Sequence, residues 1–514
     1  MSNLRFLPLL VLASLSSRAQ SAASPADPYR PVYHFTAPKN WINDANGLVY
    51  SDGKYNLFYQ YNPQSAQPGH LAWGHATSPD LLHWTHLPVA LTEYQSPDGS
   101  NTMIFSGSAV VDKDNTSGLF PGGKTNGLVA FYTGHQTRGG VTVAQHQNLA
   151  SSQDGGVTWQ RYAGNPVLDI GSTEFRDPKV FWYAPQQKWV MATVKADRQQ
   201  VYLYESKNLK QWTFLSRWGR AGDTVKEWEC PDLFELPLPG GGTKWVLLIS
   251  SGNPKEQYRG QQYFLGQFDG KTFTPDQVYA EPTYLDFGKD FFAAVTFGNA
   301  PDNRRILVGW TNDWAYARDV PTGDVWRGNF AVPRELSLRR TAAGVVLAQQ
   351  PIAELRRGSK EAISLKSKLI KAGATGFDVP FRGESYDLEL TLEPGKANLV
   401  TLDVLQSDAE KTVLRYDVAK QELTLDRTKS GNVAFNPGFA ATLETARVPL
   451  QNGQLKLRLL VDKSVVEVFA QDGETTLTDL VFPQQHSGRI SLTADGDARI
   501  NMLSLRNLSQ PLTP

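Results

Sequence analysis

The chain has 514 residues, of which 51 are basic and 51 acidic, so its formal net charge is zero. This balance gives no electrostatic case for nucleic acid or for an anionic membrane as a partner. The length suits about two or three domains with sizeable cores. Cys230 is the only cysteine, which excludes a disulfide within the chain and a Cys-rich zinc site.

The N-terminus has the pattern of a secretory signal. Arg5 supplies a positive charge, residues 6–15 form a short apolar stretch, and the small residues at 21–23 offer a cleavage site. The apolar stretch is too short to cross a bilayer as a helix. We therefore expect a signal peptide at residues 1–23 and a secreted protein, extracellular or periplasmic. A mobile N-terminal tail is the alternative.

From residue 24 onward, nearly all of the apolar pattern is typical of β-strands. Residues 47–61 form two β-rich runs joined at Asp52-Gly53, which is a strong hairpin signal. The same design recurs at 106–132, 178–194, 231–250 and 291–310. A turn that ends in an aromatic residue follows four of the hairpins, at Trp84, Trp159, Trp212 and Phe273.

The hairpins begin near residues 44, 106, 177, 229 and 290, at intervals that suggest one repeated four-stranded unit. Five such units predict a five-bladed β-propeller over residues 24–345. A generic all-β meander is the alternative, and the repeated order of hairpin and aromatic turn favours the propeller. Residues 346–360 are expected to be a linker with a short helical segment at 351–357, and residues 361–514 a β-sandwich.

Three short acidic motifs stand at the hairpin entries. They are Asn40 to Gly47, Phe175 to Pro178 and Trp228 to Asp232, and each places a carboxylate beside an aromatic residue and a turn former. Equivalent positions of successive blades meet at one end of a propeller axis. Two carboxylates that flank a glycosidic bond are what sugar hydrolysis requires, and a third can hold sugar hydroxyls.

Each motif also has a purely local interpretation. Asp44 lies in a turn-forming sequence, Asp177 is next to Arg176 and fits a structural ion pair, and Glu229 fits a surface acid. Their joint position at the blade entries favours the catalytic interpretation. The sequence contains no Gly-x-Ser-x-Gly, no His-Glu-x-x-His and no dinucleotide fingerprint. We predict no metal and no organic cofactor.

The motifs resemble those of glycoside hydrolase family 32, the invertase, inulinase and levanase family. The resemblance covers nearly all of the chain after the predicted signal. Its motifs here are Trp41 to Gly47, Phe58 to Pro63, Trp73 to His75, Phe105 to Ser108, Phe175 to Pro178, Glu229 to Pro231, Trp326 to Gly328 and Asp462 to Phe469.

The resemblance implies a retaining β-fructosidase that releases terminal non-reducing fructose from levan, inulin or sucrose. Asp44 would be the nucleophile, Glu229 the acid/base, and Asp177, oriented by Arg176, the transition-state stabiliser. The resemblance further implies substrate-binding roles for Asn43, Gln60 and Ser106, and a pocket wall built by Trp41, Trp73, Phe105 and Trp326.

Two positions depart from the family pattern: Ala45 stands where the family usually has proline, and Ile42 where it commonly has methionine. Proline pre-sets a turn and alanine does so less, so the rigidity of this loop stays open. Three alternatives also stay open: fructosyl transfer, endo cleavage, and a fructan-binding protein of weak catalytic power. The sequence predicts neither the preferred linkage nor the oligomeric state.

Overall fold

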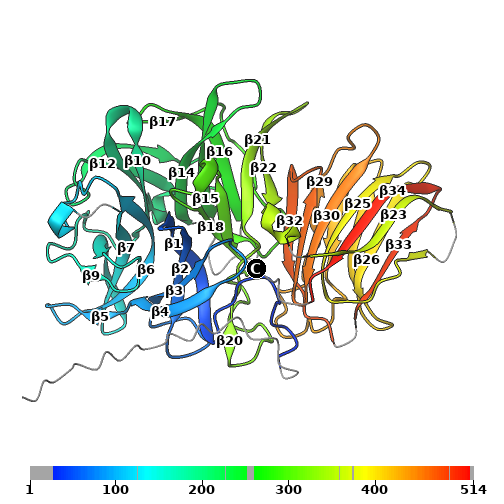
Figure 1. Ribbon diagram of the computed structural model, residues 1–514, viewed down its shortest axis with the longest axis horizontal. Coiled ribbons are helices and arrows are strands. Elements are labelled where there is room, and N and C mark those ends of the chain that lie inside the picture. Colours follow the sequence, from blue (N-terminus) through cyan, green and yellow to red (C-terminus); the bar gives the residue numbers. More distant parts are fainter. Residues whose placement is uncertain are drawn as a thin grey trace, which may run out of the picture.

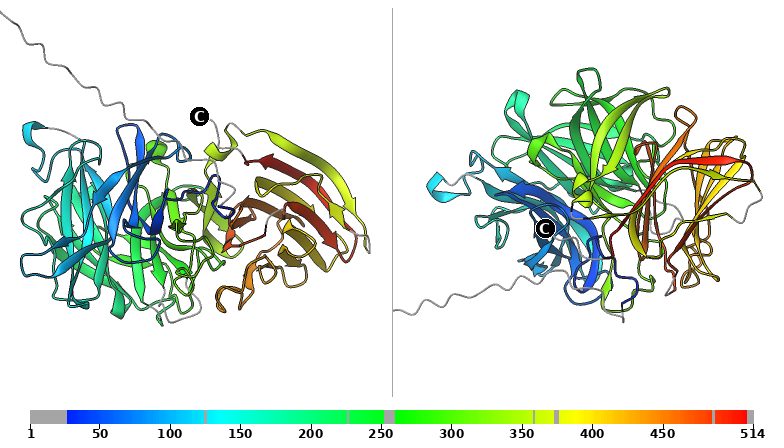
Figure 2. Two further views of the ribbon diagram at one scale, coloured as in Figure 1. Left: turned by 90° about the horizontal axis from the view of Figure 1, so that it is seen from below. Right: turned by 45° about the vertical axis from the view of Figure 1, so that its right-hand side comes forward.

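The computed structural model describes residues 27–123, 126–225, 227–251, 260–357, 359–372, 376–484 and 487–509. The predicted signal peptide at 1–23 lies outside these residues. Two bodies lie side by side: one is formed by the blue to green part of the chain, the other by the yellow to red part (Figure 1, Figure 2). No described helix has the length and apolarity that crossing a membrane requires.

Five sheets form the first body. The first sheet contains β20 (Trp326–Arg327), β1 (Asn40–Ser51), β2 (Lys54–Asn62), β3 (Ala72–Ser78) and β4 (Thr85–Leu91). The second contains β5 (Tyr94–Gln95), β6 (Asn101–Asp112), β7 (Gly127–Arg138), β8 (Val141–Ser152) and β9 (Gln160–Arg161). The third contains β10 (Phe175–Tyr183), β11 (Lys188–Lys195), β12 (Gln200–Ser206) and β13 (Thr213–Gly219).

The fourth sheet contains β14 (Trp228–Pro237), β15 (Thr243–Ser251), β16 (Gly260–Phe268) and β17 (Phe273–Pro275). The fifth contains β18 (Phe292–Thr296), β19 (Ile306–Trp310), β21 (Arg334–Thr341) and β22 (Gly344–Pro351). The leading strands β1, β6, β10, β14 and β18 each contact the next, and β18 contacts β1 again. The five sheets therefore close into a ring, and the predicted five-bladed propeller is confirmed.

The aromatic turns predicted from the sequence share one hydrogen bond. The indole nitrogens of Trp84, Trp159 and Trp212 each donate to the backbone carbonyl three residues earlier, at 2.8–3.1 Å. A serine caps each turn: Ser78 and Ser206 accept a backbone hydrogen bond from the residue two positions later. The repeated sequence thus encodes a repeated closed loop that holds a tryptophan in each of the first three blades.

The second body is a β-sandwich of two six-stranded sheets. One sheet contains β23 (Glu361–Ile370), β34 (Ala498–Asn507), β25 (Ser385–Glu393), β30 (Leu455–Asp462), β31 (Val465–Ala470) and β32 (Thr475–Leu480). The other contains β24 (Phe377–Asp378), β33 (Arg489–Ala494), β26 (Leu399–Gln406), β27 (Thr412–Asp417), β28 (Glu422–Asp426) and β29 (Glu444–Arg447). Buried Leu, Val and Ile side chains from both sheets form one core between them, as the predicted sandwich requires.

Helical structure among the described residues is limited to short 3-10 turns. They are η1 (Pro121–Gly123), η2 (Ala184–Gln186), η3 (Ala196–Arg198), η4 (Pro301–Asn303) and η5 (Ala353–Arg356). The turn η5 occupies the predicted helical segment between the domains. The last blade extends beyond the expected boundary at residue 345, because β22 pairs with β21 as far as Pro351.

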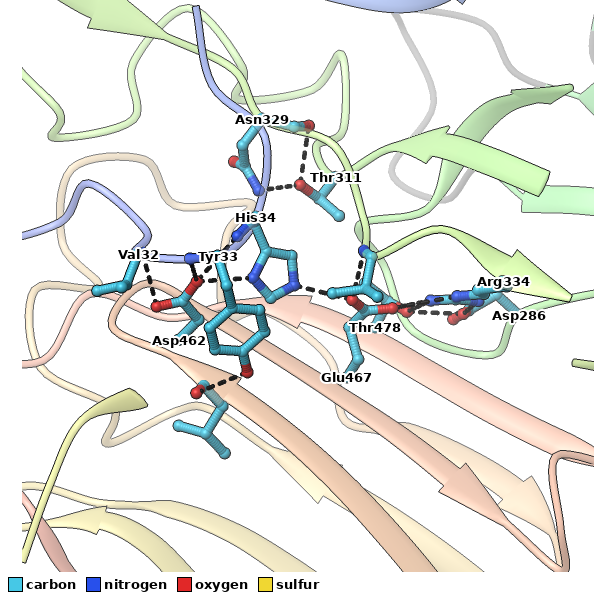
Figure 3. A network of polar contacts seen from close by, with 12 residues as sticks. Val32, Tyr33, His34, Asp286, Thr311, Asn329, Arg334, Asp462, Glu467 and Thr478 are labelled. Carbon is cyan, nitrogen blue, oxygen red and sulfur yellow. Dashed lines mark hydrogen bonds and ion pairs between the residues drawn. The ribbon is translucent and has the colours of Figure 1, made fainter. Parts of the chain in front are cut away.

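A buried ionic network joins the two bodies (Figure 3). His34, in the segment before β1, contacts Asp462 through Nδ1 at 2.9 Å and Glu467 through Nε2 at 2.8 Å. Arg334 at the start of β21 pairs with Glu467 at 2.5 Å and with Asp286 at 2.9 Å. All five side chains are at most 1% exposed. The carboxylates of Asp462 and Glu467 in the sandwich are thus neutralised by the cations His34 and Arg334 on the propeller side.

The protonation of His34 should make this interface sensitive to pH. Burial alone would lower the pKa of His34, but its hydrogen bonds to Asp462 and Glu467 raise that pKa to about 9. Because the folded pKa exceeds the ordinary value, the stability supplied by charged His34 is full below about pH 6.5 and is lost as pH rises through about 9.

We therefore expect His34→Gln to lower the urea midpoint strongly at about pH 6 and much less at about pH 10, because the wild-type histidine is then neutral too. Removing one partner of a buried ion pair costs about 3–5 kcal/mol. Equilibrium denaturation at both pH values measures the difference. His70→Gln is the control, since the His70 side chain is 53% exposed. A loss that is equal at both pH values would contradict the assignment of a charged His34.

Candidate active site

A break in strand pairing occurs near the start of every leading strand. The register shifts between Ile42 and Ala45, Ile104 and Gly107, Arg176 and Lys179, Glu229 and Asp232, and Phe292 and Val295. Irregularities of this kind release residues from the ladder and re-aim their side chains. Each of the three predicted carboxylates lies in or beside such a break.

Left-handed backbone accompanies three of these breaks, at Asp177, Cys230 and Ala293. Asp177 has φ 61° and Cys230 has φ 47°, a conformation that is uncommon outside glycine and is costly to hold. It turns the backbone N–H of Cys230 toward Asp177 Oδ2, at 2.9 Å. The strain therefore places a donor from blade four on a carboxylate from blade three.

The thiol of Cys230 lies beside two of the three carboxylates. Its Sγ is 3.6 Å from Asp44 Oδ2 and 3.7 Å from Asp177 Oδ2. Burial raises the pKa of this thiol well above its ordinary value, and Asp177, Asp44 and Glu229 raise it further. Cys230 is thus a neutral S–H donor that bridges Asp44 and Asp177, and the structure brings these two residues together as the sequence analysis expected.

Donors are arranged on both oxygens of the partly exposed Asp44 carboxylate. Ser106 Oγ donates to Oδ2 at 2.5 Å, and Asn43 Nδ2 donates to Oδ1 at 3.0 Å. Trp41 Nε1 in turn donates to Asn43 Oδ1 at 2.7 Å. Hydrogen bonds to a carboxylate are short and strong, so this chain of contacts fixes the orientation of Asp44.

Glu229 has a different environment. Its side chain is 25% exposed and accepts a hydrogen bond from Arg176 Nη2 at 3.2 Å. Burial raises the pKa of Glu229 to about 8; Arg176 opposes this rise, and Asp177 and Asp44 add to it. Burial likewise raises the pKa of Asp177 to about 6, against Arg176 and with help from Asp44. Glu229 is therefore protonated at neutral pH.

Arg176 pairs with glutamates on both sides of the cluster. Besides Glu229, its guanidinium contacts Glu174 at 2.5 Å and Glu227 at 3.5 Å. Although burial alone would lower the pKa of Arg176, Glu229, Asp177 and Glu174 raise it. The sequence analysis expected Arg176 to orient Asp177, whereas its ion pairs hold Glu229 and the flanking glutamates.

The remaining predicted binding residues fall into two groups by exposure. Phe105 is partly exposed and stacks on His135 with ring centroids 4.1 Å apart. Trp41, Trp73 and Trp326 are at most 1% exposed, and Gln60 is also 1% exposed with its amide donating to the carbonyl of Ile104. These three indoles are covered, so they do not form an exposed wall as predicted; Trp73 Nε1 donates to the carbonyl of Phe105 at 3.1 Å.

Two side chains that the sequence analysis did not single out support the cluster. Thr133 on β7 accepts a hydrogen bond from the backbone N–H of Asp177 at 2.9 Å. Asn46 donates to the carbonyl of Asp44 and accepts from the N–H of Gly107. Thr133 carries no local signal in the sequence, because its role depends on blades two and three lying side by side.

The described residues contain no group of three or more His, Cys, Asp or Glu side chains arranged to hold a metal ion. What they contain is a protonated carboxyl, a carboxylate held by two donors, and a third carboxyl beside them. In such a set, the protonated carboxyl can give its proton to one atom of a bound molecule while the carboxylate attacks another atom.

Comparisons with known proteins agree with this geometry. The family described as "Glycosyl hydrolases family 32 N-terminal domain" matches residues 34–351, and "Glycosyl hydrolases family 32 C terminal" matches residues 351–507. A levanase from Bacillus subtilis is 44% identical, with 98% of this chain and 74% of the levanase covered. An extracellular exo-inulinase from Aspergillus ficuum is 40% identical, with 96% and 97% covered.

Solved structures resemble the whole chain as well. The crystal structure of an exo-inulinase from Aspergillus awamori superposes with a TM-score of 0.86 at 38% identity, covering 93% of this chain and 98% of that one. A β-fructofuranosidase from Schwanniomyces occidentalis, complexed with fructosyl-erythritol, has a TM-score of 0.83 at 28% identity, with 95% and 99% covered.

The environment of Cys230 predicts that its thiol resists modification in the native protein, because the thiolate is the reactive form and the residue is 4% exposed. At about pH 8, a chromogenic aromatic disulfide should react with Cys230 of the native protein only as fast as the protein unfolds. In denaturant the same reaction should be immediate. Since Cys230 is the only cysteine, absorbance reports it alone. Rapid modification of the native protein would show that the thiol does not lie between the carboxylates.

Proposed function

We propose a reaction course for this protein from the premise that the chain belongs to glycosyl hydrolase family 32. The protein is a glycoside hydrolase of the β-fructofuranosidase type. Its substrates are fructans such as levan and inulin, together with sucrose, and it removes the terminal non-reducing fructose. No resident metal or organic cofactor takes part in the course proposed here.

One observation supports the division of roles: two carboxyl groups of one cluster stand in opposite environments. The pKa of Glu229 is raised to about 8, mainly by burial, so this residue can donate a proton at neutral pH. Asp44 accepts hydrogen bonds at both oxygens, which suits a nucleophile held in one orientation. In glycosidases, different environments give two carboxyls the separate roles of acid and nucleophile.

In the first step, an oxygen of Asp44 attacks the anomeric carbon of the fructosyl unit. The bond from that carbon to the glycosidic oxygen breaks, and Glu229 gives its proton to the departing oxygen. A covalent fructosyl ester on Asp44 results. In the second step, the ionised Glu229 takes a proton from water, the water oxygen attacks the same carbon, and Asp44 leaves. Two inversions give retention of configuration.

Asp177 stabilises the oxocarbenium-like transition state and holds fructose hydroxyls. Its carboxylate is fixed by the N–H of Cys230, and its backbone by Thr133. Arg176 acts on Glu229, which it holds through a hydrogen bond. Asn43, Ser106 and the partly exposed Phe105 are the proposed sugar contacts.

The buried residues have indirect roles in this scheme. Trp41 orients Asn43, and Gln60 and Trp73 fix the backbone around Phe105. Trp326 packs beneath Arg30 at 4.6 Å, away from direct contact with sugar. Removal of these side chains therefore disturbs the geometry of the pocket more than its chemistry.

Secretion is part of the proposal. It is supported by the signal-like sequence at residues 1–23 and by similarity to exo-inulinases described as extracellular. Fructosyl transfer to a sugar acceptor, endo cleavage and sugar binding without turnover are the competing functions. The products distinguish them.

A time course with levan, inulin and sucrose tests the function, with products resolved by chromatography. We expect fructose as the sole early product from both fructans. Asp44→Asn and Glu229→Gln should each lower kcat by several orders of magnitude, about 10⁴-fold or more, without unfolding the protein. Early oligosaccharides would indicate endo cleavage or transfer. A kcat close to that of the wild-type protein in either variant would refute the role assigned to that residue.

The pH dependence should follow Glu229. Because the acid must be protonated to act, activity should fall as pH rises through about 8. Glu227 is one of the charges that raise this pKa, so Glu227→Gln should move the alkaline limb of the profile of kcat/KM to lower pH by a few tenths. Glu205→Gln is a matched control, since the Glu227 and Glu205 side chains are both 37% exposed. An alkaline limb that does not move, or moves upward, would contradict this electrostatic account.

A further inference from the structure

A cavity of about 620 Å³ lies within the propeller, and none of Asp44, Asp177 and Glu229 lines it. Its lining comes from all five blades and follows the break in each leading strand. It includes Val49 from blade one, Ala109 to Asp112 from blade two, Lys179 to Tyr183 from blade three, Asp232 to Glu235 from blade four, and Gly298, Asn299 and Arg305 from blade five. The cavity falls within the range of about 300–1,000 Å³ typical of ligand pockets.

A buried polar contact separates this cavity from the cluster. Lys179 Nζ donates to Asp232 Oδ2 at 2.9 Å and to the carbonyl of Thr296 at 2.6 Å. Lys179 follows Asp177 on β10, and Asp232 follows Glu229 on β14. Because all the leading strands run in the same direction around the axis, residues before and after the break face opposite ends. The cavity is therefore a site of its own.

Asp232 brings an unused acceptor to the floor of the cavity. The residue is fully buried, and its Oδ2 accepts from Lys179 and from both the N–H and the hydroxyl of Thr296. Its Oδ1 is buried and accepts no hydrogen bond from any described residue. A buried acceptor without a partner costs about 1–3 kcal/mol, so this atom suits a ligand that donates.

Arg305 brings unused donors to the same cavity. Its guanidinium lies over the ring of Phe234, 4.9 Å from the centroid, and within the described part of the chain it forms no ion pair or side-chain hydrogen bond. Burial lowers the pKa of Arg305, and Asp232 opposes this change. A guanidinium has five N–H donors, so Arg305 can serve several acceptor atoms of one ligand.

An exposed aromatic side chain completes the set. Trp182 lines the cavity, is 40% exposed and packs against Trp189, with ring centroids 5.0 Å apart. An exposed indole offers a flat apolar face on which a ligand can pack. Within the described residues, the cavity therefore combines the flat apolar face of Trp182, the unpaired acceptor Asp232 Oδ1 and the unpaired N–H donors of Arg305.

The charges around the cavity decide the class of ligand. The lining carries charges of both signs, so it favours neither a simple anion nor a simple cation: the carboxylates are Asp112, Asp114, Asp232 and Glu235, and the cations are Lys113, Lys179 and Arg305. A neutral molecule that carries hydroxyls satisfies both kinds of group, because each hydroxyl donates and accepts. Its C–H faces would pack on Trp182.

We propose that this cavity is a second, non-catalytic carbohydrate site, which binds a neutral sugar of about one to three rings. Asp232 Oδ1 accepts a sugar hydroxyl, Arg305 donates to sugar oxygens, and Trp182 stacks on a ring face. The site goes beyond the proposed function and rests on that function only for the choice of sucrose as the probe.

Calorimetric titration of the full-length Asp44→Asn protein with sucrose tests the site, because this variant should not consume the probe. We expect two sugars bound per chain. In the same background, Arg305→Gln and Trp182→Ala, each made singly, should weaken one binding event at least tenfold and leave the other. Phe214→Ala on β13 is the matched control, since Phe214 is 51% exposed and lies outside the cavity.

The outcomes separate this site from the catalytic one. A single event that Arg305→Gln and Trp182→Ala weaken would keep the second site and question the catalytic assignment. A single event that both variants leave unchanged would overturn the second site alone, whereas the absence of any event would overturn the second site and also question the catalytic assignment. Binding of inorganic phosphate that Arg305→Gln abolishes, without sucrose binding there, would show an anion site and refute the proposal.

Discussion

The break in strand pairing near the start of each leading strand is the constraint on which the rest of the catalytic end depends. A regular ladder would alternate side chains between the two faces of each blade, so no carboxyl would point along the axis. The break frees residues such as Asp177 from that alternation, at the cost of left-handed backbone. Closure of five blades into a ring then brings Asp44, Asp177 and Glu229 to one place.

Once these carboxyls are together, they cannot all ionise freely. Burial and mutual repulsion raise the pKa values of Asp177 and Glu229, and Arg176 offsets part of that effect, as do the hydrogen bonds from Cys230 at Asp177. The single thiol beside them stays neutral and donates. Partial burial thus lets Glu229 keep its proton near neutral pH, and this is the property that acid-assisted cleavage of a glycosidic bond needs.

The β-sandwich packs against the propeller and also supplies a charged group to it. Glu467 belongs to the sandwich, yet its partners His34 and Arg334 belong to the propeller side. Burial would raise the pKa of Glu467, but Arg334 and His34 lower it to about 2. Separation of the two bodies would part Glu467 from both of these partners, although Arg334 would keep Asp286, which explains why the sandwich, without a catalytic group of its own, is held as a fixed partner.

Local patterns in the sequence were enough to predict the hairpins, the aromatic turns, the five repeats and the position of each carboxyl in its repeat, because these depend on residues a few positions apart. Only the tertiary structure decided that Arg176 pairs with glutamates, that Trp41 and Trp73 are covered, and that Asp232 keeps one bare oxygen beside Arg305. Burial, protonation and pairing depend on which distant segments exclude water from one another, and no local pattern encodes that.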